Sequence, residues 1–135
     1  QFIDGEIYLN NNQIFRTVIS KSDELYCGPQ KIEVITYEEK LPNGKNYLAS
    51  YRKDYTFMNS EKYIVPENHF FFLGDNRDCS KDSRFLDEVG YVHQNNLVGK
   101  AQILFFSSDP RVASIFNFTK WKNSIRFKRF FKKLI

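Results

Sequence analysis

An eleven-residue polar stretch, Gly74–Arg84, is the part of the sequence whose residue types and spacing could do chemistry. It reads GDNRDCSKDSR and mixes three acids with three bases, namely Asp75, Asp78, Asp82, Arg77, Lys81 and Arg84. A solvated surface loop does not need opposed charges at such close spacing. A loop in a cleft does, because charges removed from water must be paired and hydrogen-bonded. The composition is that of a preorganised polar loop beside a reactive centre, or of an Asx-rich hairpin turn.

The elements that must position this stretch are predicted to be β-strands. The apolar run 70–73 directly before it indicates a buried strand that delivers the chain to one fixed point. Further strands are expected at 6–9, 13–19, 31–37, 46–52 and 97–106. Asn-rich residues 10–12 and the Asn43-Gly44 pair are typical of tight turns between them. The sequence therefore predicts a mainly antiparallel β body, in which residues 5–60 form scaffold rather than a site.

The residue order Gly-Asp-Asn-Arg-Asp-x-Ser-x-Asp-Ser-Arg resembles the last conserved box of bacterial type I signal peptidases, membrane-bound serine proteases with a Ser/Lys dyad. Nine of the ten fixed positions match, and Cys79 stands where the family usually carries Asn. Residues 96–101 resemble the family's returning strand, and Val65-Pro66 sits where the family enters the box. The resemblance implies an antiparallel β-barrel or β-sheet domain of the signal-peptidase type over residues 1–109. It also implies an enzyme that cleaves N-terminal signal peptides after small residues.

The lysine of such a dyad must be neutral to accept the serine proton, although a free lysine has a pKa of about 10.4. Burial lowers that pKa, and a hydroxyl can orient the amine without adding a charge that would raise it again. The resemblance gives this role to Ser80. It makes Asp82 and Arg84 a pair that braces the site, and Gly74 and Asp75 the residues that bring the loop against the lysine. Loop structure alone is expected of Asn76, Arg77 and Asp78.

The nucleophilic serine and the lysine base are expected to lie outside these 135 residues. Neither a Ser-Met-Pro-like segment nor a Lys-Arg-Val-x-Gly-x-Pro-Gly-Asp-like segment occurs in the sequence, and Lys81 and Ser83 belong to the pattern of the box itself. The chain starts at Gln1, and its only methionine is Met58. We therefore expect a fragment or processed product, without the dyad-bearing N-terminal part of the domain and without peptidase activity by itself.

Two cysteines and two histidines are interpreted as structural. Cys27 and Cys79 are far apart in the sequence, which leaves open whether they pair. A nucleophilic Cys needs a neighbouring base, and no His lies near Cys79, which is interpreted as a tolerated replacement for Asn. His69 and His93 lie in no zinc or serine-triad pattern and are interpreted as loop histidines. No metal and no cofactor are predicted.

The C-terminal residues 110–135 carry eight Lys or Arg and no acid, whereas residues 1–109 carry twelve bases against sixteen acids. Asp109-Pro110 is typical of a helix start. The apolar residues fall on two faces, which favours two short helical segments with a break near Arg126. We interpret 110–135 as a basic, aromatic, amphipathic helical tail that contacts an anionic membrane surface. The residues assigned to this contact are Trp121, Phe127, Phe130 and Phe131; a disordered basic end and nucleic-acid binding are the alternatives.

The resemblance places the protein at the bacterial inner membrane, with its catalytic domain on the extracytoplasmic side. Its expected partners are signal-peptide-bearing preproteins and the anionic membrane surface, and no nucleic acid is expected. A truncated, non-catalytic homologue that binds membrane or a partner is the rival hypothesis. A basic-tailed nucleic-acid-binding β-barrel is a third, which leaves the ordered box unexplained.

Overall fold

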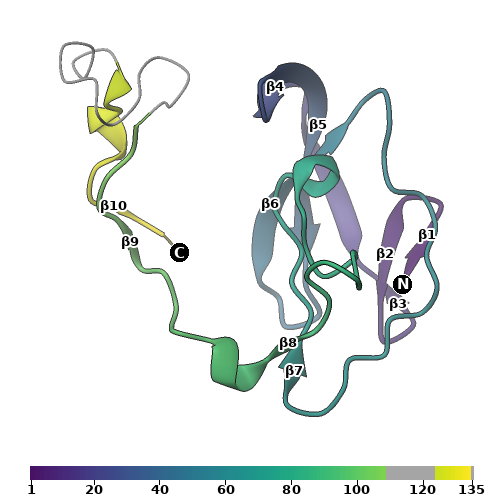
Figure 1. Cartoon of the computed structure of the whole chain (residues 1–135). Helices are drawn as coiled ribbons and strands as arrows, with labels where there is room; N and C mark the ends of the chain where they lie inside the picture. Colours follow the sequence, from purple (N-terminus) through teal and green to yellow (C-terminus); the bar gives the residue numbers. More distant parts are fainter. Residues whose placement is uncertain (109–123, 135) are drawn as a thin grey trace. The chain divides into compact units, whose positions relative to one another are not determined.

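The computed structural model describes residues 1–108 and 124–134, and the chain divides into two compact units, residues 1–96 and 97–135. The first unit carries most of the strands and the whole polar box (Figure 1). The predicted mainly antiparallel β fold is confirmed. In the described residues the strands form four separate sheets, of three, two, three and two strands, and none of these sheets closes into a barrel.

The chain begins with a small meander of β1 (Phe2–Ile3), β2 (Glu6–Leu9) and β3 (Asn12–Gln13). Its second turn uses Asn10 and Asn11, both with positive φ. Asn tolerates this left-handed backbone better than most residues, which is why the Asn-rich segment turns here. The predicted strand at 6–9 and its turn are confirmed.

A larger sheet follows, in the order β4 (Phe15–Cys27), β5 (Gln30–Lys40) and β6 (Asn46–Arg52). The strands predicted at 31–37 and 46–52 are confirmed. The β5–β6 turn has Gly44 at a φ of 81°, the left-handed conformation that the Asn-Gly pair predicts. Register shifts interrupt β4 between Val18 and Asp23. Such bulges increase local twist, and Figure 1 shows the long β4–β5 ribbon curling toward its outer end.

The buried apolar core lies where the two three-stranded sheets meet. Its members are Phe2, Ile14, Ile32, Val34, Ala49 and Tyr51. Val34 is fully buried in the central strand β5, where it pairs with Arg52 of β6 and Asp23 of β4. Because this apolar core is small, polar contacts and a disulfide must hold the loops that follow β6 in place.

Three strand predictions are wrong in extent. The segment 13–19 is divided at Ile14 between β3 and the longer β4. The run 70–73 contributes only Phe70 to β7 (His69–Phe70), which pairs with β8 (Val92–His93) before the short 3₁₀ helix η2 (Gln94–Asn96). Phe70 and Phe72 are 44% and 46% exposed, so this run is not a buried strand. The apolar pattern misled because it does not reveal whether a second layer covers a strand. Residues 97–106 contain only β9 (Ile103–Leu104).

The described part of the tail differs from the predicted helix. Residues 127–129 form the 3₁₀ helix η4 (Phe127–Arg129), and β10 (Lys132–Lys133) pairs antiparallel with β9. Phe131 has a positive φ, which ends any helix there, and the Leu134 N–H donates to the Gln102 carbonyl at 2.8 Å. Trp121 and the predicted first helical segment lie outside the described residues. No helix in residues 1–108 and 124–134 is long and apolar enough to cross a membrane.

Candidate functional site

The polar box turns back on itself so that Ser80 lies against the backbone of Gly74. A Cβ added to Gly74 would overlap both the Oγ and the Cβ of Ser80 and would approach the Oδ2 of Asp82 at 3.6 Å. Gly74 is therefore required by close packing, since its φ is not in the left-handed region. The structure brings together Gly74, Ser80 and Asp82, three of the predicted site residues.

Asp82 and Arg84 form a buried ion pair under this turn. Arg84 donates from Nε to Asp82 Oδ1 at 2.8 Å and from Nη2 to Asp82 Oδ2 at 2.9 Å, and both side chains are buried. The same Oδ2 accepts the Gly74 backbone N–H at 2.9 Å. Burial alone would raise the pKa of Asp82, but the hydrogen bonds from Arg84 and Gly74 outweigh it and hold that pKa below its ordinary value. Asp82 thus carries a charge and fastens Gly74 to the end of the box.

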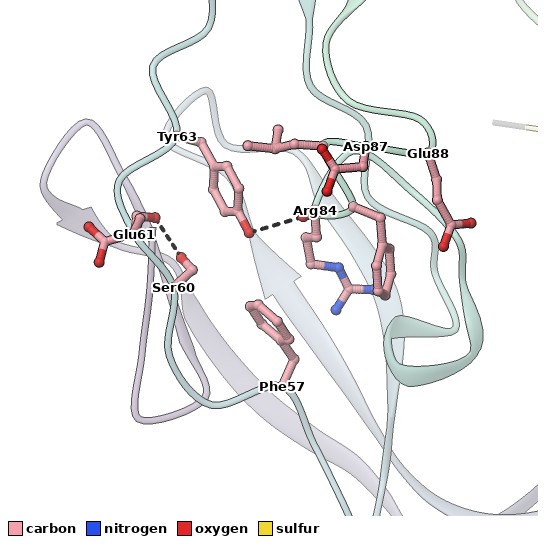
Figure 2. A pocket seen from close by; sticks show the side chains of 9 residues that line it. Phe57, Ser60, Glu61, Tyr63, Arg84, Asp87 and Glu88 are labelled. Carbon is pink, nitrogen blue, oxygen red and sulfur yellow. Dashed lines mark hydrogen bonds between the residues drawn. The ribbon is translucent and has the colours of Figure 1, made fainter.

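Arg84 also connects the end of the box to other parts of the domain. Its Nη2 donates to the backbone carbonyl of Arg77, and its guanidinium packs on the rings of Phe2 and Phe57, 5.7 and 5.5 Å from their centroids. Figure 2 shows Arg84 beside Phe57 and Tyr63 in a pocket of about 450 Å³, where the Tyr63 hydroxyl donates to the Arg84 carbonyl at 3.4 Å. The aromatic contacts fix the guanidinium plane that Asp82 binds.

The middle of the box is the 3₁₀ helix η1 (Arg77–Cys79), and each of its residues is tied to a different element. Arg77 donates from Nη2 to Glu39 Oε2 of β5 at 2.6 Å, with both side chains almost fully buried. Asp78 accepts the Arg52 N–H at 2.9 Å and the Phe57 N–H at 3.1 Å. Loop structure alone was the role predicted for Asn76, Arg77 and Asp78, and it stays a prediction.

Two tyrosines of β6 complete the Arg77 cluster. The Tyr51 hydroxyl donates to Glu39 and accepts from Arg77 Nη1 at 3.2 Å, and the Tyr47 hydroxyl accepts from Arg77 Nη2 at 3.3 Å. Burial raises the pKa of Tyr47 to about 12 and that of Tyr51 further still, so both remain neutral hydrogen-bonding groups. Sequence reasoning missed Glu39, Tyr47 and Tyr51. Glu39 lies beyond the strand predicted at 31–37, and Tyr47 and Tyr51 were placed only on the predicted strand 46–52, so the sequence held no signal for this cluster.

Cys79 is bonded to Cys27, with the two Cα atoms 5.5 Å apart. The sequence left this pairing open. Cys27 is the last residue of β4, at the outer end of the long ribbon, so the disulfide joins that end to the residue before Ser80. Neither sulfur is a free thiol, and Cys79 is not available as a nucleophile.

Ser80, Asp75 and Asn76 are the box residues whose side chains make no hydrogen bond, ion pair or disulfide among the described residues, and the Oδ1 of Asn76 is buried. Ser80 is partly exposed, and its Oγ has no hydrogen-bond partner among the described residues. Asp75 is exposed, and its backbone carbonyl accepts the Ser50 N–H at 2.8 Å. Asp75 and Arg77 border an apolar groove of about 950 Å³. Its other lining residues include Phe2, Ile7, Ile14, Ile64 and Leu73.

The remaining candidates in the box are structural. Ser83 is fully buried, and its Oγ accepts the Phe72 N–H at 2.9 Å. Lys81 is 76% exposed and paired with Glu88 at 2.6 Å. A neutral lysine base needs burial away from carboxylates, so Lys81 lacks the required setting.

His69 and His93 face each other across β7 and β8 with ring centroids 4.9 Å apart. In residues 1–108 and 124–134 no three metal-ligating side chains gather.

A β domain that carries this box, braced by an Asp/Arg pair and presenting a free serine hydroxyl, is the architecture that the resemblance implies. The family model described as signal peptidase, peptidase S26, matches residues 1–106. The chain therefore belongs to the signal peptidase S26 family.

Individual relatives carry the same description. The chain is 35% identical to the signal peptidase I of Rickettsia typhi over 150 aligned positions, which cover 99% of this chain and 54% of the relative. It is 36% identical to that of Rickettsia bellii strain OSU 85-389, covering 99% and 50%. The chain thus spans about half the length of the curated relatives it matches. No solved structure matches it.

Proposed function

We propose that this chain is the C-terminal part of the catalytic domain of a type I signal peptidase, a serine endopeptidase that removes signal peptides from secreted preproteins. The observation that carries the proposal is the placing of Ser80. Its hydroxyl lies against Gly74, next to the Asp82–Arg84 pair, and has no hydrogen-bond partner among the described residues. A hydroxyl held in this way is free to accept a hydrogen bond from an incoming amine.

In this proposal Ser80 orients the lysine of a Ser/Lys dyad that lies outside residues 1–135. The neutral amine donates one N–H to Ser80 Oγ, which leaves its lone pair directed at the nucleophilic serine. The lysine takes the serine proton as the serine attacks the scissile carbonyl, and it gives that proton to the leaving amine as the C–N bond breaks and the acyl-enzyme forms. Asp82 and Arg84 hold the turn while adding no net charge that would favour the ammonium form.

The test is peptide cleavage by the full-length protein, which includes the segment before Gln1. A preprotein with a small residue before the cleavage site should be cut. Ser80→Ala should lower kcat by about 10²-fold or more, with little change in KM, because a positioned acid–base partner contributes about 10²–10⁴-fold. Lys81→Ala is the matched control in the same turn and should cut at the wild-type rate. Absence of cleavage by the full-length wild type would overturn the proposal.

The purified 135-residue chain should not cleave the same substrate. Its sequence contains neither a Ser-Met-Pro-like nor a Lys-Arg-Val-x-Gly-x-Pro-Gly-Asp-like segment, and Lys81 is exposed and paired with Glu88. Cleavage by this chain, retained in Ser80→Ala, would show that the dyad has been placed wrongly and that another nucleophile acts.

We further propose that the domain works at the outer face of the bacterial inner membrane and that its C-terminal unit contacts anionic lipid. Disulfides persist in oxidising compartments such as the periplasm, which is where a Cys27–Cys79 bond would be stable. In the second unit Phe105, Phe127 and Phe131 are 70%, 62% and 64% exposed. Exposed aromatic rings beside basic residues suit the headgroup region of an anionic bilayer.

Vesicle binding tests the membrane contact. The chain should bind vesicles that contain anionic lipid more tightly than neutral ones, and deletion of residues 114–135 should remove the difference. Equal binding by the two proteins would contradict a role for the tail. Equal binding of DNA or RNA and of anionic vesicles would point to a general polyanion surface instead.

A further inference from the structure

We propose that Cys27 and Cys79 are positioning residues for the peptidase reaction, and that their disulfide makes the reaction sensitive to thiol reductants. The proposal rests on the proposed function, because it concerns the placing of Ser80. It assigns a role to Cys27, which lies on β4 outside the box, and to the one box position that departs from the family pattern.

Ser80 has no hydrogen-bond partner in residues 1–108 and 124–134, so its neighbours must hold it there. On its C-terminal side the chain is fastened by Asp82, Ser83 and Arg84, all buried and hydrogen-bonded. Lys81, between Ser80 and that anchor, is exposed and contacts only the side chain of Glu88 among the described residues. The C-terminal anchor is therefore separated from Ser80 by one residue, Lys81, that is not itself packed into the domain.

On the N-terminal side the last anchor before Ser80 is the disulfide. Arg77 and Asp78 are held by β5, β6 and the segment after β6, but the hydrogen bond of Cys79 itself is a backbone contact of 3.2 Å to the Asn76 carbonyl, inside η1. Ser80 already has extended backbone angles, with φ −86° and ψ 133°. The Sγ–Sγ bond is thus the contact that ties the residue next to Ser80 to a separate strand.

Both cysteines are partly exposed, so a small dithiol can reach the bond. A dithiol reductant converts the Cys27–Cys79 disulfide into two thiols and is itself oxidised to a disulfide. Ser80 then has a loose connection on both sides and leaves its packed position on Gly74 for part of the time. The lysine amine loses its partner for the same part of the time, so its lone pair is directed at the nucleophilic serine less often.

The first test compares the full-length protein before and after dithiothreitol treatment. We expect kcat to fall about tenfold with KM unchanged, less than the ~10²–10⁴-fold cost of losing an acid–base group completely. Cys27→Ser should behave like the reduced wild type and ignore dithiothreitol. The control is Cys27→Ser with Cys79→Asn, and a response of this variant to dithiothreitol would mean that the reductant acts elsewhere and would overturn the proposal.

Hydrogen exchange on the same protein gives a readout that does not need activity. Reduction should speed exchange in residues 76–80 and leave the paired strands β5 and β6 protected. Unchanged exchange at 76–80, or a loss of protection that is uniform across the domain, would overturn the positioning role. If the protein cleaves nothing in either redox state, the proposed function fails, and the exchange result still decides whether the disulfide holds the turn.

Discussion

At Gly74 a side chain is excluded by the place that Ser80 occupies. Glycine is not required here by the backbone conformation, because Gly74 does not have a positive φ. It is required by packing, because an added Cβ would overlap the Ser80 side chain. The family's preference for glycine at the start of the box follows from this geometry. It also links Gly74 to the chemistry, because whatever displaces Ser80 alters the site.

Gly74→Ala should therefore destabilise the domain and displace Ser80. Overpacking of this kind costs about 1–3 kcal/mol, and the free energy of unfolding in urea measures it. Gly99→Ala is the matched control, because no atom lies within 4 Å of a Cβ built there and its φ is not positive. Equal unfolding free energies for the two variants would contradict the packing argument.

The lowered pKa of Asp82 predicts how the free energy of unfolding changes at acid pH. Its folded-state pKa lies below the ordinary 3.8, so its ion pair contributes fully above that pH and is lost as pH falls through the folded value. Asp82→Asn leaves Arg84 buried without a charged partner and should cost roughly 3–5 kcal/mol near neutral pH. The difference from wild type should shrink below about pH 3.8 as Asp82 itself becomes neutral.

Urea unfolding at about pH 7 and about pH 3 checks this expectation. Asp87→Asn provides the control, because Asp87 is an exposed carboxylate a few residues further along the same chain segment. Its difference from wild type should stay within about 0.5 kcal/mol at both pH values. A gap for Asp82→Asn that is as wide at low pH as at neutral pH would contradict the sign of the pKa shift.

Between elements, the β4–β5–β6 sheet holds η1 from three sides. Glu39 of β5 binds Arg77, the Arg52 N–H at the end of β6 binds Asp78, and Cys27 at the end of β4 binds Cys79. The region interpreted from sequence as scaffold is thus the framework that fixes the box. Local patterns predicted the strands of this sheet, because hydrophobic alternation and the Asn-Gly turn are local signals.

The long-range contacts were beyond such patterns. Nothing in the sequence around Glu39 distinguishes it from its half-buried neighbour Glu38, since both sit on a strand with mixed exposure. Which side chain of β5 binds Arg77 depends on which face of that strand lies under η1. The Cys27–Cys79 pairing depends in the same way on the ribbon's length and twist. The order of the box residues was enough to predict the family. The packing that supports those residues is visible only in the three-dimensional structure.

The Arg77–Glu39 pair gives a prediction at this scale. Glu39→Gln leaves a buried guanidinium without its counter-charge and should cost about 3–5 kcal/mol in the free energy of unfolding. The exposed pair Lys31–Glu24 joins the neighbouring strands β4 and β5, with side chains 50% and 59% exposed. Glu24→Gln should therefore cost about 0–1 kcal/mol. Urea unfolding measures both, and similar costs would mean that the Arg77 site is hydrated in solution.

For the whole molecule, the proposed membrane contact rests on how charge is separated along the chain. Residues 1–109 carry an excess of acids, whereas residues 110–135 carry only bases. In the described tail Lys128, Arg129, Lys132 and Lys133 lie next to phenylalanines that pack on one another across β9 and β10, with Phe105 and Phe131 centroids 5.6 Å apart. Bases and rings are thus gathered in one small hairpin.

Replacement of Lys128, Arg129, Lys132 and Lys133 by Gln should weaken binding to anionic vesicles at low salt by up to about 4 kcal/mol, because each base near the surface contributes about 1 kcal/mol. The control variant replaces Lys21, Lys31, Lys40 and Lys45 of the β4–β6 sheet and its turn, so both variants carry the same net charge. Cosedimentation with vesicles at two salt concentrations measures the binding of both variants. Only the tail variant should lose most of its salt-dependent binding. Equal losses in the two variants would mean that net charge, and not the tail, draws the protein to the bilayer.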